Sequence, residues 1–594
     1  MQRMLAMVFM PNLSILITFA WWITCCSSSE PRLRLAAYVN PIFPGWHSDP
    51  SCVHVKESFF CVTSTFMTFP GLPVYTSRDL VTWNLASHVW NRESQLPGLS
   101  WRTPGQTNGM YAATIRHHEG VYYVVCAYLG LSDKPMGVLF NTTNPLRSSQ
   151  WSDPIILDLS EIDPDLFWDD DGKTYLTTAG ITLQEINLET GQLGEASNIW
   201  NGTSNEWPEG PHIYKKDGWY YLLIAEGGTS QKHAVSISRS KEIKGPYTAY
   251  ERNPILTNRD TTEYFQSVGH ADLFKDSNEN WWGLCLAIRS GPSYEYMPMG
   301  REAVLFNVTW NTEEWPKLEP IRGRMPPAPL PRLGSPASNK GPNVSGNDRF
   351  DFTKVTKIQS SFVHHRVPPQ NAFLLSNRGL KVRPSRANLT GDSLSTEAEL
   401  TGQNGLSLVG RRQSHTLFNF SIDIDFWPRL IGQESGLTVF RTQLEHIDLS
   451  LVRVPTTRAI NSFSNVVFRL SGVSPSRNIT THLTPVPKGW EKTTIRLEVS
   501  SPDDSKYVFT ARSMAGLGPR VVIGTVTTSA VSGRGGSGFF VGSILGAFSS
   551  CNGAGFGKDC PQGGDLLIKT WVYTSVGQKI SSVEIIPMSG STSY

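Results

Sequence analysis

The sequence predicts an all-β protein in which a five-bladed β-propeller is followed by an antiparallel β-sandwich. In the first half of the chain, a unit of one apolar strand, a tight turn and an aromatic-rich strand recurs five times. The second half contains stretches in which apolar and polar residues alternate with period two. No long amphipathic helix is visible, and a chain of 594 residues is too long for a single hydrophobic core.

The composition narrows the classes of partner. Lys and Arg total 53 and Asp and Glu total 51, so the net charge of +2 gives no reason to expect nucleic acid or an anionic membrane as a partner. Aromatic residues make up 11% of the chain and charged residues only 18%, which suits an extracellular all-β protein. Composition alone goes no further than a β-rich secreted protein.

The N-terminus predicts secretion. Residues 1–29 combine Arg3, a long apolar run and three small serines, the pattern of a cleavable signal peptide. The alternative is a transmembrane anchor, but Pro11 and Asn12 interrupt the apolar run. After removal of this segment we expect an extracellular protein without a membrane partner.

Glycosylation motifs and cysteines agree with secretion. Seven Asn-X-Ser/Thr motifs follow the signal, at Asn141, Asn201, Asn307, Asn343, Asn388, Asn419 and Asn478. Cys551 and Cys560 flank a Gly-rich loop, and Cys52 and Cys61 flank a hairpin turn, so we expect a disulfide in each pair. The two other cysteines lie in apolar strands and are expected to be buried free thiols: Cys126 and Cys285. No spacing of cysteines indicates a zinc site.

The repeats define the predicted propeller, residues 38–325. The five copies begin at Asp49, Tyr111, Asp163, Glu209 and His270. Their spacing matches the length of a four-stranded propeller blade, and their strands are apolar on both faces, as blades packed between neighbours require. The alternative is a β-sandwich whose hairpins are similar by accident.

A second domain follows a linker. Residues 326–346 are rich in Pro, Gly, Ser and Asn and lack strand periodicity, as in a linker. Residues 347–594 show period-two alternation, most clearly from Thr416 to Phe426. This pattern predicts the antiparallel β-sandwich.

The repeat starts also predict a functional site. The innermost strand of each blade lines the central channel, so equivalent positions face one axis. These positions hold Asp49, Tyr111 or Ala112, Asp163, Glu209 and His270. Converging buried charges are costly, which points to function. The alternative, that each acid caps a turn before a strand, explains one residue more readily than all of them.

Carboxylates that face each other across a pocket suit the cleavage of a glycosidic bond. One must be protonated to donate to the leaving oxygen, and the other must be ionised to activate water or attack carbon. A third carboxylate nearby raises the pKa of the acid by charge repulsion. Aromatic residues such as Phe66 and Tyr111 can supply walls on which sugar rings stack.

These residues lie in motifs that resemble glycoside hydrolase family 43, the β-xylosidases and α-L-arabinofuranosidases. The motifs are PGWHSDPS (44–51), TSTFMTFPGLPVY (63–75), SRDLVTW (77–83), IDPDLF (162–167), EGPHIY (209–214), AEGGT (225–229) and VGHAD (268–272). The second domain resembles the concanavalin A-like module of the same enzymes, most clearly at VGRRQ (409–413). The resemblance covers nearly the whole chain after the signal.

The resemblance implies roles for the carboxylates. Asp49 would be the general base, Glu209 the general acid, and Asp163 the residue that raises the pKa of the acid and orients it. The family inverts anomeric configuration, which predicts that the carboxyl groups of Asp49 and Glu209 lie about 6.5–9.5 Å apart.

The resemblance also implies a substrate-binding set. Phe66, Tyr111 and Thr229 would lie at the pocket, and Arg289 would contact sugar hydroxyls. His270 would lie near the channel centre, as a substrate-side group or as a ligand for a bound cation. The best-known members carry Trp-Ala-Pro in the second blade, where this chain has Tyr111-Ala112-Ala113. That departure leaves the choice between xylose and arabinose open.

The expected function is the inverting removal of xylose or arabinofuranose units from xylan or arabinoxylan. No cofactor is required; Ca²⁺ near His270, with a structural or electrostatic role, is the one metal considered. A relative with arabinanase or galactanase specificity is one alternative. A non-catalytic carbohydrate-binding propeller is another, but it has no need for Asp49, Asp163 and Glu209 together. We expect the sandwich to pack against the propeller and shape the pocket; a sugar-binding role for it is the alternative.

Overall fold

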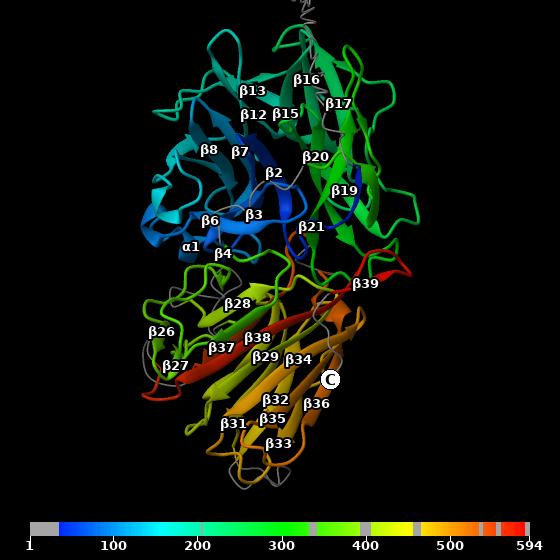
Figure 1. Ribbon diagram of the computed structural model, residues 1–594. Coiled ribbons are helices and arrows are strands. Elements are labelled where there is room, and N and C mark those ends of the chain that lie inside the picture. The colour runs from blue at the N-terminus through cyan, green and yellow to red at the C-terminus, as the bar shows by residue number, and fades with distance from the viewer. Residues whose placement is uncertain are drawn as a thin grey trace, which may run out of the picture.

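The protein consists of two all-β parts, seen one above the other in Figure 1. The structure is a computed structural model that describes residues 35–203, 206–331, 341–391, 405–455, 465–533, 539–553 and 560–588. The predicted signal, residues 1–29, lies outside these ranges. No helix within the described ranges is long and apolar enough to cross a membrane. Within them the helices are single short turns: η1 (Glu93–Gln95), α1 (Leu99–Arg102), η2 (Ser148–Gln150), η3 (Ala179–Ile181) and η5 (Thr528–Val531).

The N-terminal part contains five antiparallel sheets of four strands each. The first sheet contains β2 (Ser48–Val55), β3 (Ser58–Ser64), β5 (Gly71–Ser77) and β6 (Asn84–Trp90). The second contains β7 (Met110–His118), β8 (Val121–Tyr128), β9 (Met136–Thr142) and β10 (Ile155–Asp158). The third contains β11 (Asp165–Trp168), β12 (Thr174–Thr178), β13 (Thr182–Glu185) and β14 (Ser197–Asn198). The fourth contains β15 (Glu209–Lys216), β16 (Trp219–Glu226), β17 (Ala234–Ser240) and β18 (Thr248–Ala249). The last is β19 (Phe265–Lys275), β20 (Trp281–Arg289), β21 (Arg301–Thr309), β22 (Lys317–Leu318).

The first strands of these sheets form a closed ring. Going round it, β2 contacts β7, β7 contacts β11, β11 contacts β15, β15 contacts β19, and β19 returns to β2. This is the arrangement of a β-propeller, and it brings equivalent positions of the five repeats to one axis. The ring is also tied by β1 (Ala36–Val39), which pairs with β23 (Arg324–Ala328). β23 therefore runs into the stretch predicted as linker, and its two prolines are tolerated because it is an edge strand.

The C-terminal part is a sandwich of two sheets. One contains β26 (Phe373–Ser376), β27 (Gly379–Val382), β38 (Leu566–Lys579), β29 (Leu417–Asp425), β34 (Ile495–Asp503), β35 (Lys506–Ser513) and β36 (Val521–Thr527), with β24 (Asp348–Asp351) and β39 (Ile585–Pro587) also on β38. The other contains β28 (Leu408–Arg412), β37 (Ile544–Ser550), β30 (Glu434–Thr442), β31 (Glu445–Arg453), β32 (Val466–Val473) and β33 (His482–Pro485).

The period-two pattern accounts for the sandwich core. On β29, Phe418, Phe420, Ile422 and Ile424 are all fully buried. They pack with residues of both sheets in one apolar cluster. Between them Asp423 points the other way and is paired with Arg496 of β34 at 2.6 Å. The alternation in the sequence therefore predicts correctly which face of the strand is buried.

Both predicted disulfides are present. Cys52 and Cys61 lie directly opposite each other on β2 and β3 and are bonded, as are Cys551 and Cys560. Cys126 and Cys285 are free and buried. The bonded pairs each close a short loop, nine residues apart in sequence.

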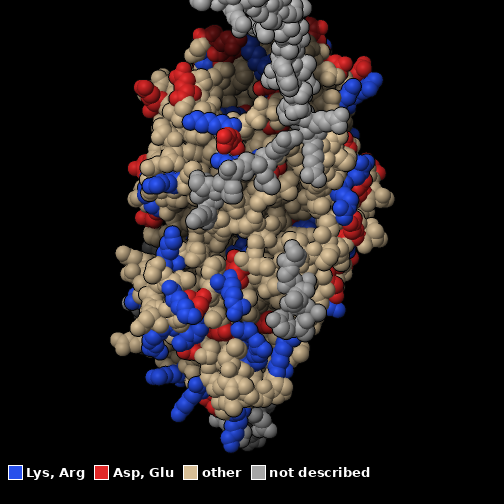
Figure 2. All heavy atoms as spheres, viewed as in Figure 1, with Lys and Arg blue, Asp and Glu red and all other residues tan. Residues whose placement is uncertain are grey.

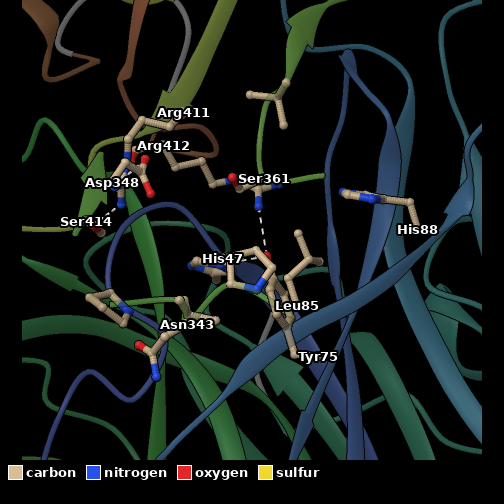
Figure 3. Close-up of a pocket in the computed structure, with 14 residues that line it drawn as sticks. His47, Tyr75, Leu85, His88, Asn343, Asp348, Ser361, Arg411, Arg412 and Ser414 are labelled. Atoms are coloured by element: carbon tan, nitrogen blue, oxygen red, sulfur yellow. Dashed lines mark hydrogen bonds and ion pairs between the residues drawn. The ribbon is translucent and has the colours of Figure 1, made fainter. Parts of the chain in front are cut away.

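The sandwich packs against the propeller, as predicted. The short strand β4 (Thr68–Phe69) of the propeller part pairs with β25 (His364–His365) of the C-terminal part. Figure 3 shows a pocket at this boundary, where Arg412 points to Tyr75. The Nη1 of Arg412 donates to the Tyr75 hydroxyl at 2.8 Å, and that hydroxyl lies 2.9 Å from Nε2 of His47. The contact ties Arg412 of the VGRRQ motif to the propeller motif that contains His47.

Charge is distributed unevenly between the two parts. On the face shown in Figure 2, Lys and Arg gather over the lower half, which is the sandwich, whereas the propeller half mixes both signs. The near-neutral total charge of the chain is therefore not uniform over its surface.

Candidate active site

The site is built from one backbone position that is repeated in every sheet. Asp49, Ala112, Asp163, Gly210 and His270 have positive φ angles of 50°, 41°, 59°, 57° and 51°. In four of the five sheets, the pairing of the first two strands also shifts register around this residue. Left-handed φ costs about 1–3 kcal/mol for a residue other than glycine, and such strain gathers at functional sites. The repeat position in the second sheet is therefore Ala112, and in the fourth it is Gly210, next to Glu209.

Three side chains meet at this level of the axis. The Nδ1 of His270 lies 4.0 Å from Oδ1 of Asp49 and 4.0 Å from Oδ2 of Asp163. All three residues are buried. Glu209 joins them through its neighbour, because the backbone N–H of Gly210 donates to Oδ2 of Asp163 at 2.9 Å. The structure thus brings together His270 and the acids that the repeats single out.

Asp49 is held as a hydrogen-bond acceptor. The Ser64 hydroxyl donates to its Oδ2 at 2.6 Å, and Nη1 of Arg301 donates to its Oδ1 at 3.2 Å. The Ser64 hydroxyl in turn accepts the backbone N–H of Ala112 at 2.7 Å, which fixes its position. Donors on both oxygens fix the orientation of the carboxylate.

The other two carboxyl groups favour the protonated form. Burial, and then the charges of Glu209 and Asp49, raise the pKa of Asp163 well above its usual range. Burial also raises the pKa of Glu209, with Asp49 acting in the same direction and Arg301 against it. Burial lowers the pKa of His270 to about 4, so this imidazole is neutral at pH 7. Two carboxyl groups with raised pKa beside a carboxylate that accepts hydrogen bonds on both oxygens are an arrangement suited to acid–base chemistry.

The arginine at the site is Arg301, not Arg289. Arg301 is the first residue of β21, and besides Asp49 it donates to the carbonyl of Thr229 at 3.3 Å. Thr229 itself lies exposed beside it. Nothing in the sequence pattern distinguishes Arg301 from other arginines at strand ends, so it is a residue that sequence reasoning missed.

Arg289 lies instead in a buried contact with the sandwich. Its guanidinium binds both oxygens of Glu302, at 2.5 and 2.9 Å, and Nη1 donates to Oε1 of Gln578 at 2.7 Å. Its side chain is 1% exposed and that of Glu302 is 0% exposed. The structure therefore does not bring Arg289 to the carboxylates, because β20 ends with this side chain turned toward β38.

Replacing Arg289 by methionine is expected to destabilise the protein without a direct effect on the carboxylates. The change leaves the charge of Glu302 buried without its partner, which costs about 3–5 kcal/mol of the free energy of unfolding. Denaturant unfolding measures this, and the double variant Arg289→Met, Glu302→Gln should recover a large part of the loss. A single variant within 1 kcal/mol of wild type would contradict the assignment.

An aromatic cluster lies beside the carboxylates. The ring of Phe66 is edge-on to Tyr111 at 4.6 Å and stacked on Trp46 at 5.8 Å between centroids. Phe66 is fully buried, whereas Tyr111 is partly exposed. As the structure stands, Phe66 therefore supports Tyr111 from behind, and Tyr111 is the ring that is open to a ligand.

The sandwich contributes a fourth ring to this cluster. Phe540, in the segment before β37, lies 6.1 Å from Phe66 and 6.4 Å from Tyr111 between centroids. The Arg301 guanidinium lies over the Phe540 ring, 4.5 Å from its centroid, and the Ser48 hydroxyl donates to the Phe540 carbonyl at 2.6 Å. Phe540 is almost 500 residues from Asp49 in sequence, and no repeat links it to the site.

The described residues offer no metal-binding cluster. Among them, no group of three or more His, Cys, Asp or Glu side chains is arranged to hold a metal ion. Around His270, the carboxylate oxygens that face it already accept hydrogen bonds from Arg301 and Gly210.

Comparison with known proteins identifies the class of site. The family model described as glycosyl hydrolases family 43 matches residues 38–316, and the model of the beta-xylosidase C-terminal concanavalin A-like domain matches residues 349–560. A non-reducing end α-L-arabinofuranosidase of Bacteroides ovatus is 34% identical over 443 residues, which cover 73% of this chain and 78% of that protein. A xylosidase/arabinosidase of Butyrivibrio fibrisolvens is 33% identical, covering 70% and 80%. The solved structure titled "Bacteroides ovatus Xyloglucan PUL GH43B" aligns with a TM-score of 0.77 at 28% identity, covering 91% of this chain and all of that one.

Proposed function

Because this chain belongs to glycoside hydrolase family 43, we propose that it removes single xylose or arabinofuranose units from xylan or arabinoxylan by inverting hydrolysis. The observation that carries the proposal is the meeting of Asp49, Asp163 and His270, with Glu209 beside them, at one repeated backbone position. Relatives named as xylosidases and arabinofuranosidases support the substrate class.

In the proposed mechanism, two carboxyl groups act on opposite faces of the sugar. Glu209, whose pKa is raised by burial, donates its proton to the glycosidic oxygen as the bond to the leaving group breaks. Asp49, held in place by Arg301 and Ser64, takes a proton from a water molecule that attacks the anomeric carbon. The two carboxyl groups are expected to lie about 6.5–9.5 Å apart, which leaves room for that water.

Asp163 has the role of positioning and tuning Glu209. It accepts the backbone N–H of Gly210 and so fixes the strand start from which Glu209 projects. Charge repulsion between Asp163 and Glu209 is mutual, so this pair favours the form that holds a proton.

Replacing Asp163 by asparagine is expected to shift the pH profile. Glu209 must be protonated to act, so activity is lost as pH rises through its pKa. Asp163 and Glu209 repel each other when both are ionised, so ionisation of Asp163 raises the pKa of Glu209; asparagine cannot ionise, and the alkaline limb of kcat/KM should therefore move to lower pH. Rates measured from pH 4 to 9 check this, with Asp170→Asn, in an exposed turn, as the control. An alkaline limb at or above its wild-type position would refute the role.

The substrate-binding set consists of side chains around the carboxylates. Tyr111 offers the open ring for stacking, Phe66 supports it, and Thr229 and Arg301 lie where sugar hydroxyls are within reach. His270, neutral at pH 7, can exchange hydrogen bonds with a hydroxyl of the bound unit. Phe540 closes one side, which favours removal of terminal units over cleavage within a chain.

Replacing Phe540 by alanine is expected to raise KM for short substrates about tenfold and to change kcat less. The ring is lost from the wall but no reacting group is removed, so the effect is on uniform binding of the sugar. Steady-state kinetics on xylobiose check this, with Phe539→Ala as the adjacent control, because Phe539 packs against Tyr294 rather than Tyr111. A variant in which kcat alone falls would show that Phe540 acts on the reacting groups.

Three further proposals concern the whole chain. Each of the five four-stranded sheets is one blade, so the propeller has five blades and occupies residues 38–325, with the linker at 326–346 and the sandwich at 347–594. The protein is secreted and its signal is residues 1–29. The two disulfides support an oxidising, extracellular location.

A panel of substrates tests the proposed function. We expect wild-type protein to hydrolyse p-nitrophenyl β-xyloside, p-nitrophenyl α-L-arabinofuranoside or arabinoxylan, and NMR of the first product formed should show inverted configuration. The ratio between substrates gives the preferred sugar. Activity only on arabinan or galactan would replace the substrate class, and binding without turnover would indicate a carbohydrate-binding protein.

A further inference from the structure

A second polar layer lies one step along the axis from the carboxylates. In all five first strands, the residue two positions after the repeated backbone position is polar: Ser51, Thr114, Asp165, His212 and Asp272. The strand β7 also supplies Arg116, four positions after Ala112, and its long side chain reaches into the same layer. Every first strand of the ring therefore contributes to this layer.

Arg116 binds the layer together. Its Nη1 donates to Oδ2 of Asp272 at 2.8 Å and to the Ser51 hydroxyl at 3.1 Å. Its Nη2 donates to Oδ2 of Asp165 at 2.7 Å and to Oδ1 of Asp272 at 3.2 Å, and lies 3.1 Å from Nδ1 of His212. One guanidinium thus contacts side chains from the four other first strands.

The two carboxylates of the layer have no free oxygen. Besides Arg116, Asp272 accepts the Ser51 and Tyr214 hydroxyls, at 2.7 and 2.8 Å. The Oδ1 of Asp165 accepts its neighbouring backbone N–H at 2.8 Å. Although burial alone would raise it, Arg116 lowers the pKa of Asp272 to about 2, so this carboxylate is ionised at every working pH. A fixed cation therefore already lies between the two carboxylates of the layer.

These contacts bear on the cation that the family resemblance suggests near His270. Calcium requires six to eight oxygen ligands. Both carboxylates below His270 are occupied by Arg116, and those beside it are occupied by Arg301, Ser64 and Gly210. The described residues do not fit a resident calcium ion.

We propose that the guanidinium of Arg116 is the resident cation of the propeller axis, and that it holds the layer beneath His270 rigid without a metal ion. Arg116 is then a positioning residue. It fixes β11, β15 and β19, and through them the starts of the strands from which Asp163, Glu209 and His270 project. This role of Arg116 deepens the proposed function. Only the kinetic test of the role depends on the proposed function, because that test needs hydrolytic activity.

Metal binding tests the proposal without any substrate. Wild-type protein treated with EDTA and dialysed is titrated with CaCl₂ by calorimetry, and its melting temperature is measured with EDTA and with 5 mM CaCl₂. We expect no calcium binding that depends on His270, so the calorimetric titration should be the same for wild type and His270→Ala. The melting temperature of the wild type should be the same in EDTA and in CaCl₂. A stoichiometric calcium ion that His270→Ala loses would overturn the proposal.

Kinetics test the positioning role. We expect EDTA and CaCl₂ to change wild-type kcat less than twofold. Arg116→Met should lower kcat at least tenfold with KM changed less than threefold, and Arg116→Lys, which keeps the charge, should recover part of it. The control is Arg239→Met, an arginine that stacks on Trp219 and Trp315. Wild-type kcat in Arg116→Met, or abolition of wild-type activity by EDTA with recovery in calcium, would overturn the proposal.

The two tests separate failures. If wild-type protein is inactive on every substrate, the proposed function fails, and the calorimetric result alone decides the role of Arg116. If Arg116→Met does not fold, the EDTA and calcium measurements on wild type remain decisive.

Discussion

Replacing Glu209 by glutamine is expected to lower kcat on xylobiose or arabinoxylan about 10²–10⁴-fold, the contribution typical of a positioned general acid. The glutamine amide has nearly the same shape but no proton to donate to the leaving oxygen. Burial raises the pKa of Glu209, which favours the form of this side chain that carries the proton. Steady-state kinetics on both substrates measure the loss, and KM should change little because the side chain keeps its size.

The leaving group supplies an internal check on this role. p-Nitrophenolate departs without protonation, so the loss of kcat on p-nitrophenyl substrates should be much smaller than on xylobiose. The control is Glu185→Gln, a surface carboxylate whose partner is Lys173 at 2.5 Å. Equal losses on both kinds of substrate would show that Glu209 is not the acid.

Replacing Asp49 by asparagine is expected to lower kcat by a similar or larger factor on every substrate. The amide oxygen of asparagine can still accept from Arg301, but the NH2 group cannot accept the Ser64 hydroxyl and the amide cannot take a proton from water; the base is needed whatever the leaving group. The loss should therefore be about 10³-fold on p-nitrophenyl and natural substrates alike. The contrast with Glu209→Gln assigns the two roles without reference to any relative.

A stability measurement separates chemistry from folding in that variant. Asp49 lies against Arg301 and 4.0 Å from His270, so the neutral amide removes one ion pair from a buried site. The melting temperature of Asp49→Asn should still lie near that of wild type, because the amide keeps the size of the carboxylate and its oxygen can still accept from Arg301. Residual activity above a tenth of wild type on p-nitrophenyl substrates would exclude Asp49 as the base.

The repeats made much of the site predictable from sequence. Asp49, Asp163 and His270 stand at one position of a recurring unit, and a propeller places such positions on one axis. The same logic left Tyr111 and Ala112 as alternatives, and backbone dihedral angles distinguish them. The repeat pattern also predicted that Glu209 is equivalent to Asp49. The structure shows that Gly210, the residue after Glu209, has the positive φ angle that Asp49 has.

The rest of the site depends on contacts that no local pattern encodes. Arg301 reaches Asp49 because the register of β20 and β21 places it there, and a register is fixed by packing rather than by composition. Phe540 arrives from the sandwich, so its role depends on how the two parts dock. The family resemblance implied that Arg289 contacts sugar hydroxyls, but its side chain lies in the contact between propeller and sandwich, where it donates to Gln578.

The pairing of β1 with β23 joins the two ends of the propeller part. The strand that precedes the first sheet meets its partner only after residues 324–328 have left the ribosome. Phe540 follows more than 200 residues later. A nascent chain that ends before Phe540 therefore lacks one wall of the site, and the aromatic cluster is complete only once nearly the whole polypeptide has been made.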